Sequence, residues 1–443
     1  MVAFLLLAPS LAAPAANRLL VAVGDVSASH AVVWARGPGE GPLRMEYGPA
    51  GASPTGRASL TLAHSQDFTG KILLTGLRPA TRYAYRVEAG GATAGGEFVT
   101  APAADDPAPV TFLWSGDLGG SGFCRRQDKG YRIFATMARH RPDFFLFVGD
   151  TIYADQRCRV PESVPGSDFL ARSLRGFRAK YRYSRTDPAV HAFLRTTSVS
   201  AIWDDHEVVN DFAGPSEPLM PVGRQAFLEY WPIQSAPGDP TRLYREVRWG
   251  RLVDLFILDT RQYRSPNAMP DGPGKTMLGV AQRDWLLEGL RGSDAVWKVV
   301  VSSVSLSIPT GREARDSWAN GSTALRPDGT PTGFEHELLG IVRQLAAHRV
   351  RNVVWLVADV HRAEVIRHTP LPGLVFHELV AGPLSASMGR PGILDHTLRP
   401  TRLYGEGGFY NFGELHVTEA GLTVRIIDAA GRGRFETTLA PEL

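Results

Sequence analysis

The chain has 443 residues, of which 44% are hydrophobic and 21% charged. This length exceeds what one hydrophobic core usually serves, so we expect a large and a smaller domain, and the ordinary globular composition excludes a mainly disordered chain. The formal net charge of +3, from 48 basic and 45 acidic residues, provides no broad field for nucleic acid, so no nucleic-acid partner is expected.

The first residues resemble an export signal. Residues 4–16 combine a short apolar run with small side chains at Ala13 and Ala15, as in the apolar core and cleavage site of a secretory signal. No Lys or Arg precedes the run, and a buried strand is the alternative. We expect residues 1–16 to direct a periplasmic or secreted protein. No later apolar run reaches the roughly 18 residues that a transmembrane helix needs, so we expect no integral membrane segment.

Residues 17–101 consist of short alternating segments separated by turn residues, a pattern typical of a β-sandwich. The segments are residues 31–35, 43–47, 71–74, 83–87 and 97–100. The stretch that ends at Tyr83 resembles the tyrosine corner of fibronectin type III domains, in which the phenol hydroxyl bonds to nearby backbone. We predict an all-β, fibronectin III-like N-terminal domain, followed by a Pro-rich linker at residues 102–109.

Residues 110–443 alternate apolar runs of strand length with helical stretches, as expected for strands that helices bury on both faces. The predicted strands are residues 110–114, 144–148, 199–203, 252–258, 299–301 and 353–357, with later ones at 375–380, 412–417 and 422–427. The predicted helices are residues 131–139, 281–290 and 335–348. The pattern indicates an α/β catalytic domain.

Acidic and histidine side chains follow several of these strands. The groups are SGD at 115–117, GDTIY at 149–153, DDHE at 204–207 and DVH at 359–361. A single Asp after a strand is often only a helix cap, and a lone His is usually packing. Because ligands bind beyond the carboxyl ends of parallel strands, we expect these groups to converge. The resulting carboxylates would repel one another, and bound cations would relieve that repulsion most simply.

The amino-acid sequences of these motifs resemble those of a known family. Their order is similar to that in the calcineurin-like and purple acid phosphatase-related metallophosphoesterases, and the detail resembles the PhoD-like alkaline phosphatase/phosphodiesterase family most closely. The stretches concerned are FLFVGDTIYAD at 145–155, WDDHEV at 203–208, LDTRQYR at 258–264 and ADVHRAE at 358–364. The resemblance covers essentially the whole chain and implies a four-layer α+β metallophosphoesterase sandwich.

The resemblance also implies a set of metal ligands. They are Asp117, Asp150, Tyr153, Asp205, Asn210, Asp359 and His361. Asp117, Tyr153 and His361 would bind one ion, which Asp150 would bridge to a second ion held by Asp205 and Asp359, with Asn210 as a further candidate. Phenolate and carboxylate suit Fe³⁺ at the first position, and an all-oxygen set suits Ca²⁺, Mg²⁺ or Mn²⁺ at the second. Asp205 and Asp359 depart from the purple acid pattern, which has Asn and His there.

The implied reaction is hydrolysis of phosphate mono- or diesters by a metal-bridged hydroxide. His206 is the candidate catalytic residue, as stabiliser of the phosphoryl group or proton donor to the leaving oxygen, with Asp204 and Glu207 orienting it or the ligands. The candidates for binding the phosphate are Arg125, Arg261 and Arg362. For Arg261 we favour instead a structural pairing with Asp259.

Several alternatives stay open. A phospholipase D-type hydrolase is the alternative within the enzyme class, a catalytically inactive cell-surface binding protein is one outside it, and the charge balance disfavours a nuclease. An oxidising compartment would let Cys124 and Cys158 pair and join two loops of the site, and two unlinked thiols are the alternative. The basic cluster at residues 172–185 is interpreted as solvated surface. The sequence makes no prediction of oligomeric state.

Overall fold

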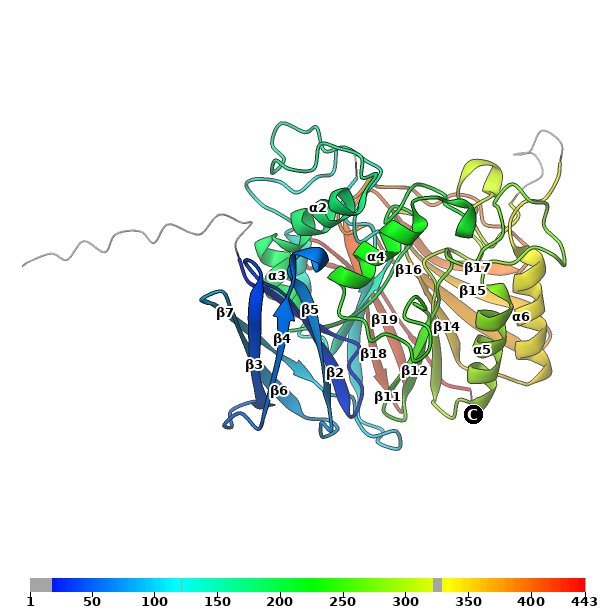
Figure 1. The fold of residues 1–443 in the computed structure, drawn as a ribbon. Coiled ribbons are helices and arrows are strands. Elements are labelled where there is room, and N and C mark those ends of the chain that lie inside the picture. Colours follow the sequence, from blue (N-terminus) through cyan, green and yellow to red (C-terminus); the bar gives the residue numbers. More distant parts are fainter. Residues whose placement is uncertain (1–17, 121, 322–328, 443) are drawn as a thin grey trace, which may run out of the picture.

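The computed structural model of the chain describes residues 18–120, 122–321 and 329–442. The predicted export signal at residues 1–16 lies outside these ranges. Two large mixed β-sheets face each other, and helices flank the pair (Figure 1). The four-layer α/β architecture expected from the family resemblance is therefore confirmed.

The first sheet has nine strands and runs through both halves of the protein. In spatial order its strands are β20 (Gly433–Leu439), β19 (Gly421–Asp428), β18 (Asn411–Thr418), β8 (Val110–Ser115), β9 (Phe144–Val148), β10 (Ser198–Ile202), β1 (Leu20–Gly24), β2 (His30–Arg36) and β5 (Thr69–Thr75). Strands β8, β9 and β10 are parallel to one another, and β1 continues the parallel set by pairing with β10. The N-terminal β-region is thus an extension of the sheet that contains β8, β9 and β10.

A smaller sheet packs on β1, β2 and β5 to form the N-terminal sandwich. Its four strands are, in order, β4 (Gly56–Leu62), β3 (Gly41–Pro49), β6 (Arg82–Ala89) and β7 (Ala92–Val99). The two sheets share one apolar core, to which Val21, Val33 and Leu43 contribute. The Arg78 amide donates to the Tyr83 hydroxyl at 2.9 Å, so the predicted tyrosine corner and the all-β character of this region are confirmed.

The second large sheet has seven strands. They are β11 (Arg245–Trp249), β12 (Val253–Ile257), β13 (Trp297–Val301), β14 (Val353–Val357), β16 (Leu374–Val380), β15 (Ala363–Leu371) and β17 (Pro400–Glu406). Strands β12, β13, β14 and β16 are parallel, so their carboxyl ends lie along one edge. That edge carries the Asp359–His361 segment.

Helices cover the outer faces of the two large sheets. They are α1 (Ile133–Arg139), α2 (Leu174–Arg185), α3 (Pro188–Leu194) and α4 (Met220–Tyr230) beside the first sheet, and α5 (Gly279–Gly292) and α6 (Glu335–Ala347) beside the second. Short 3-10 helices occur at His64–Gln66, Gly214–Ser216 and Arg312–Ala314. None of the helices in the described part of the chain is long and apolar enough to cross a membrane.

Strand β9 shows why these strands are apolar at every position. Phe145 and Phe147 contact Phe134 of α1, with ring centroids 6.5 and 6.4 Å apart. Phe144, on the opposite face of the strand, lies 4.6 Å from the ring of Trp249 at the second sheet. Because side chains alternate along a strand, one run serves both the helix layer and the layer between the sheets.

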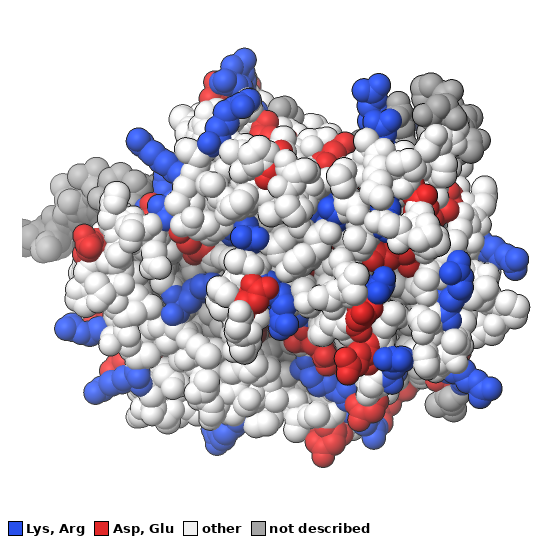
Figure 2. Space-filling model, turned by 45° about the vertical axis from the view of Figure 1, so that its right-hand side comes forward, with Lys and Arg blue, Asp and Glu red and all other residues white. Residues whose placement is uncertain are grey.

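The basic cluster at residues 172–185 is not a solvated surface throughout, so that interpretation is wrong for Arg185 and Lys180. Both are 3% exposed. The Arg185 guanidinium lies 4.4 Å from the ring of Trp34 and 4.8 Å from that of Trp231. This contact joins the N-terminal sandwich to the helix layer of the catalytic region. Elsewhere, acidic and basic side chains are interspersed over the face shown in Figure 2.

Candidate metal centre

The strand-end motifs turn sharply at the carboxyl edge of the two sheets. Asp117, Asp150 and Asp359 follow β8, β9 and β14, and each has a left-handed backbone, with φ of 64°, 50° and 65°. Such φ values are strained for residues other than Gly and cluster at functional sites. Gly382 faces this point, because a Cβ there would lie 2.4 Å from the Asp117 Oδ2 atom. The backbone is thus shaped to bring carboxylates together.

Ligand atoms from distant segments lie close to one another. Atoms of Asp117, Asp150 and His361 are within 4.8 Å of one another, and so are atoms of Asp150, Asp205 and His206. Asp150 belongs to both groups. The Tyr153 hydroxyl is 3.0 Å from the Nε2 atom of His361, which places it beside the first group. The structure therefore brings together residues that the sequence separates by more than half the chain.

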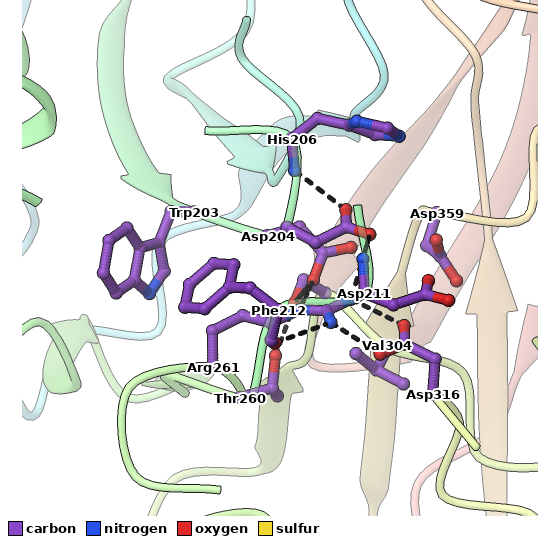
Figure 3. Close-up of polar contacts among 12 residues, drawn as sticks. Trp203, Asp204, His206, Asp211, Phe212, Thr260, Arg261, Val304, Asp316 and Asp359 are labelled. Atoms are coloured by element: carbon purple, nitrogen blue, oxygen red, sulfur yellow. Dashed lines mark hydrogen bonds and ion pairs between the residues drawn. The ribbon is translucent and has the colours of Figure 1, made fainter. Parts of the chain in front are cut away.

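The acidic cluster continues beyond these two groups. The Asp359 amide donates to Asp117 Oδ1 at 3.2 Å, and Figure 3 shows its carboxylate beside those of Asp211 and Asp316. Asp205, Asp211 and Asp316 form a third set of carboxylates with oxygens within 4.8 Å. The cluster thus extends from Asp117 to Asp316 without a break.

The charges in this cluster are not balanced by the protein. Buried carboxylates outnumber the buried guanidiniums of Arg261 and Arg264. These carboxylates are Asp117, Asp150, Asp204, Asp205, Glu207 and Asp316. The Oδ2 atoms of Asp117 and Asp359 are buried without a hydrogen-bond partner. Buried polar atoms are rarely left unsatisfied, so the donor set fits cations.

Burial and mutual repulsion also change the proton affinities of these groups. Desolvation, followed by the charges of neighbouring carboxylates, raises the pKa values of Asp117, Asp150 and Asp359 well above the ordinary range. Burial would raise the pKa of Asp205 too, but the Arg261 guanidinium and His206 more than offset it and lower that pKa. The Asp205 carboxylate also accepts hydrogen bonds from the His206 and Asp211 amides, at 2.9 and 2.7 Å.

His206 is oriented by Asp155. Its Nδ1 atom is 2.7 Å from Asp155 Oδ1, and its ring stacks on Tyr153 with centroids 4.2 Å apart. Burial disfavours its charged form, but the carboxylates of Asp205 and Asp155 prevail and raise the pKa of His206 to about 9. A protonated imidazole next to the acidic cluster is suited to donating a proton.

Orientation of His206 by Asp204 or Glu207 is corrected by the structure. Glu207 accepts hydrogen bonds from the Thr151 amide and hydroxyl, both at 2.6 Å, and from the Asp204 amide at 2.9 Å. It therefore ties the loop after β9 to the loop after β10. The second suggestion for this pair, that it orients the metal-binding loops, agrees with these contacts.

The cluster opens into a cavity of about 580 Å³. Acidic groups, including Asp150, Asp205 and Asp359, form part of its lining, with His206 and His361. Its other walls include Thr310–Arg312 on one segment and Ser387–Gly389 on another. The acidic groups are therefore accessible to a small molecule.

Two sequence profiles of one protein family match this chain. The sequence profile described as PhoD-like phosphatase matches residues 112–417, and the one described as its N-terminal domain matches residues 10–102. The chain belongs to the PhoD-like phosphatase family. It is 27% identical over 340 residues to alkaline phosphatase D of Bacillus subtilis (strain 168), a match that covers 69% of this chain and 55% of that relative's length.

Solved structures show the same fold. One described as PhoD superposes with a TM-score of 0.77 at 20% identity, covering 96% of this chain and 92% of the other. The purple acid phosphatase PPD1 from yellow lupin (Lupinus luteus) seeds gives a TM-score of 0.67 at 13% identity, covering 96% of this chain and 74% of the other. The likeness therefore extends over the sandwich as well as the catalytic region.

The candidate phosphate-binding arginines of this PhoD-like chain are placed differently from one another. The Arg125 guanidinium pairs with Asp187 at 3.0 Å and donates to the Thr186 hydroxyl at 3.0 Å, so it braces a loop. Arg362 lines the cavity, where Glu364 accepts from its Nε atom at 2.6 Å. Asn210 is exposed and also lines the cavity.

Arg261 lies under the cluster and is 0% exposed. Its Nε atom donates to Asp204 at 2.6 Å, and its Nη atoms donate to both carboxylate oxygens of Asp316 at 2.6 and 2.7 Å (Figure 3). The role is structural, as we favoured, but Asp259 is not the ionic partner: its carboxylate contacts the Arg261 backbone amide, at 3.1 Å, and not the guanidinium. The guanidinium holds together the loops after β10, β12 and β13.

Sequence reasoning missed some residues of the site. Asp211 and Asp316 join the acidic cluster, and Ser387 bonds to His361. Asp316 and Ser387 lie outside the quoted motifs, so only their place in the fold identifies them. Asp155, by contrast, ends the quoted stretch 145–155, two residues after Tyr153. Because Asp155 lies only five residues after Asp150, its carboxylate could have been suggested as a partner for His206.

Cys124 and Cys158 form a disulfide, with Cα atoms 5.7 Å apart. This confirms pairing over the alternative of two unlinked thiols. Cys124 follows the loop that carries Asp117, and Cys158 follows the loop that carries Asp150 and Tyr153. The bridge therefore joins the chain segments that leave these two loops.

Proposed function

We propose that this protein is an alkaline phosphatase or phosphodiesterase that hydrolyses phosphate mono- or diesters with the help of bound metal ions. The observation that carries the proposal is the convergence of Asp117, Asp150, Asp205 and His361 on one accessible cavity, with buried carboxylate oxygens that lack any partner. Family membership and the relative named alkaline phosphatase D support it.

The donor types suggest which ions the residues would hold. Asp117, Tyr153 and His361 would bind Fe³⁺, because phenolate and carboxylate are hard donors. Asp150 would be shared with a second ion, Ca²⁺ or otherwise Mg²⁺ or Mn²⁺, for which Asp205, Asp359 and Asn210 offer only oxygens. When bound, such a pair of ions neutralises charge on the phosphoryl oxygens and lowers the pKa of water toward neutrality.

His206 is the residue that we assign to proton transfer. It lines the cavity, and the carboxylate of Asp155 beside its Nδ1 atom favours its protonated form, so it can donate to the leaving oxygen of the ester. Asp155 holds the Nδ1 atom, which leaves Nε2 as the donating atom. The stacking on Tyr153 fixes the plane of the ring.

Arg362 is the arginine that we retain for binding the substrate. Glu364 is fully buried and accepts from the Nε atoms of both Arg362 and Arg402, each at 2.6 Å. The hydrogen bond to Glu364 fixes the Arg362 guanidinium at the cavity wall. There the guanidinium can bind a phosphoryl oxygen or a charged part of the alcohol. A fixed guanidinium loses little entropy on binding.

We also propose that the protein acts outside the cytoplasm and that the chain divides as its sequence suggests. The apolar segment at residues 4–16 and the Cys124–Cys158 disulfide support an exported, periplasmic or secreted protein. The division proposed is a signal at 1–16, a sandwich at 17–101, a linker at 102–109 and a catalytic region at 110–443.

The test is hydrolysis of 4-nitrophenyl phosphate and its bis-ester by the purified full chain, stripped of metal and then resupplied with iron and calcium. We expect activity that depends on metal, that is abolished in Asp150→Asn and that survives in the surface control Asp284→Asn, whose side chain is 60% exposed. Absence of hydrolysis in the metal-loaded wild type would reject the proposal.

A second variant tests the role of His206. His206→Ala should retain its metals by elemental analysis and lose roughly 10²–10⁴-fold in kcat, the usual contribution of a general acid. Loss of metal from this variant would instead make His206 a ligand.

A further inference from the structure

The segment Ser387–Gly389 is bound to His361 on both sides of Met388. The Ser387 hydroxyl is 2.7 Å from His361 Nδ1, and the Gly389 amide donates to the His361 carbonyl at 2.8 Å. The carbonyl of Gly389 in turn accepts from the Gly408 amide at 3.1 Å. Met388 is therefore held at a fixed place next to a residue of the proposed metal centre.

The chain just before this segment is fixed in the same way. The Leu384 and Ser385 amides donate to the carbonyls of Gly116 and Asp117 at 2.9 and 3.0 Å, and the Gly119 amide donates back to the Ser385 carbonyl at 2.6 Å. Residues 384–389 thus run along the Asp117 loop and then along His361. These backbone hydrogen bonds fix the position of residues 384–389 relative to the cavity.

Met388 differs in character from the rest of the cavity lining. Its side chain is 42% exposed, while Val360, the other large apolar residue among the described lining residues, is only 6% exposed. The remaining lining is acidic, basic, small or hydroxylated, apart from the amide of Asn210. Met388 is therefore the large apolar side chain of the described lining that a bound molecule can readily contact.

We propose that Met388 is a specificity-determining residue that contacts the alcohol part of the ester, so that the preferred substrates are phosphate esters of apolar alcohols. This inference rests on the proposed function. The phosphoryl group would lie on the acidic floor, and an ester bound there must extend its alcohol toward the walls. An unbranched thioether adapts to alkyl and aryl groups of different shape, which suits a class of apolar alcohols.

The test compares two esters whose alkyl alcohols differ in polarity, hexyl phosphate and glycerol phosphate, by release of inorganic phosphate. The same two alcohols are also presented as methyl diesters, whose hydrolysis is followed by chromatography of the released alcohol because it yields a phosphate monoester and no inorganic phosphate. Met388→Gln keeps the length of the side chain and removes its apolar character. Comparing variant with wild type on each ester cancels differences in leaving-group chemistry.

We expect Met388→Gln to lower kcat/KM for the hexyl ester about tenfold, equivalent to about 1.4 kcal/mol, and to change that for the glyceryl ester less than twofold. Met388→Leu should retain the hexyl preference because it stays apolar. The matched control is Met269→Gln, since Met269 is 37% exposed and does not line the cavity, and it should change neither ester.

Equal effects of Met388→Gln on both esters, or no effect on either, would overturn the inference while leaving the proposed function intact. Loss of the hexyl preference in Met388→Leu would also overturn it, because an apolar contact should tolerate this change. If the metal-loaded wild type hydrolysed none of the esters, including the nitrophenyl esters, the proposed function would fail and this inference with it.

Discussion

Replacing Arg261 with Met should destabilise the protein more than it impairs substrate binding. The guanidinium is fully buried and makes charged hydrogen bonds of 2.6 to 2.7 Å to Asp204 and Asp316. Met fills much of the same space but removes the guanidinium that pairs with Asp204 and leaves Asp316 with Arg264 alone. Breaking a buried ion pair on one side costs about 3–5 kcal/mol, because the remaining charge stays desolvated.

The expected decrease in Tm follows from the loss of stability and the length of the chain. At about 2.1 cal/mol/K per residue, 443 residues give an unfolding entropy of about 0.9 kcal/mol/K near Tm, so the loss corresponds to roughly 3–5 °C. Thermal unfolding measured on chelated protein isolates this effect from metal binding. Arg432→Met is a suitable control, since Arg432 pairs with Asp428 but its side chain is 72% exposed, and it should shift Tm by less than about 1 °C.

Kinetics on the metal-loaded variants complete the comparison. Arg362→Met should raise KM, because Arg362 lines the cavity, and should lower Tm less than Arg261→Met does, because Arg402 still pairs with the buried Glu364. The reasoning would be refuted if Arg261→Met unfolded at the temperature of the wild type while raising KM. That result would mean that the guanidinium leaves its carboxylates to bind substrate.

Three other outcomes are expected. Iron-loaded wild type should show a visible phenolate-to-iron absorption band that Tyr153→Phe lacks, and colourless, iron-free but fully active wild type would refute the iron assignment. Ser387→Ala should weaken metal binding about 10–100-fold in equilibrium dialysis, because the hydroxyl orients His361, and Ser387→Thr should restore it. Burial, with the nearby Arg185 and Arg195 charges, lowers the pKa of His191 to about 4, and its Nε2 atom accepts from the Val21 amide at 3.3 Å. The unfolded chain therefore binds more protons between about pH 6.5 and 4, so stability should fall by up to about 3 kcal/mol as pH drops through this range. The fall should be smaller in His191→Gln, measured by urea unfolding at each pH, and an equal fall would show that His191 does not titrate as described.

The buried strands could be predicted because burial on both faces leaves a plain signal in the sequence. Strands β9 and β14 coincide with the predicted residues 144–148 and 353–357. Strands β4 and β17 were not predicted, because their exposed faces leave only short or irregular apolar patterns. Helix α2 was hidden by its many basic residues, one of which, Arg185, is buried by stacking on Trp34 and Trp231 from other elements.

The convergence of the candidate metal ligands was predictable where the residues stand in strand-end motifs, and less so where they do not. Asp117, Asp150, Asp205 and His361 meet as expected from their positions after parallel strands. The partners of Arg261 could not be predicted, because Asp204 and Asp316 lie 57 and 55 residues away along the chain. Such contacts depend on how loops from different strands are packed, and no local pattern encodes that.

The pairing of β1 with β10 affects how the protein can be divided. β10 ends at Ile202, shortly before Asp205 and His206, and its other neighbour is β9. Truncating the chain before residue 110 would remove this pairing at Val199 and so extend the exposed edge of β10, and exposed strand edges invite aggregation. It would also remove Trp34 from the buried Arg185. The sandwich therefore stabilises the rest of the chain through β10 and Arg185, and residues 110–443 alone would lack both contacts.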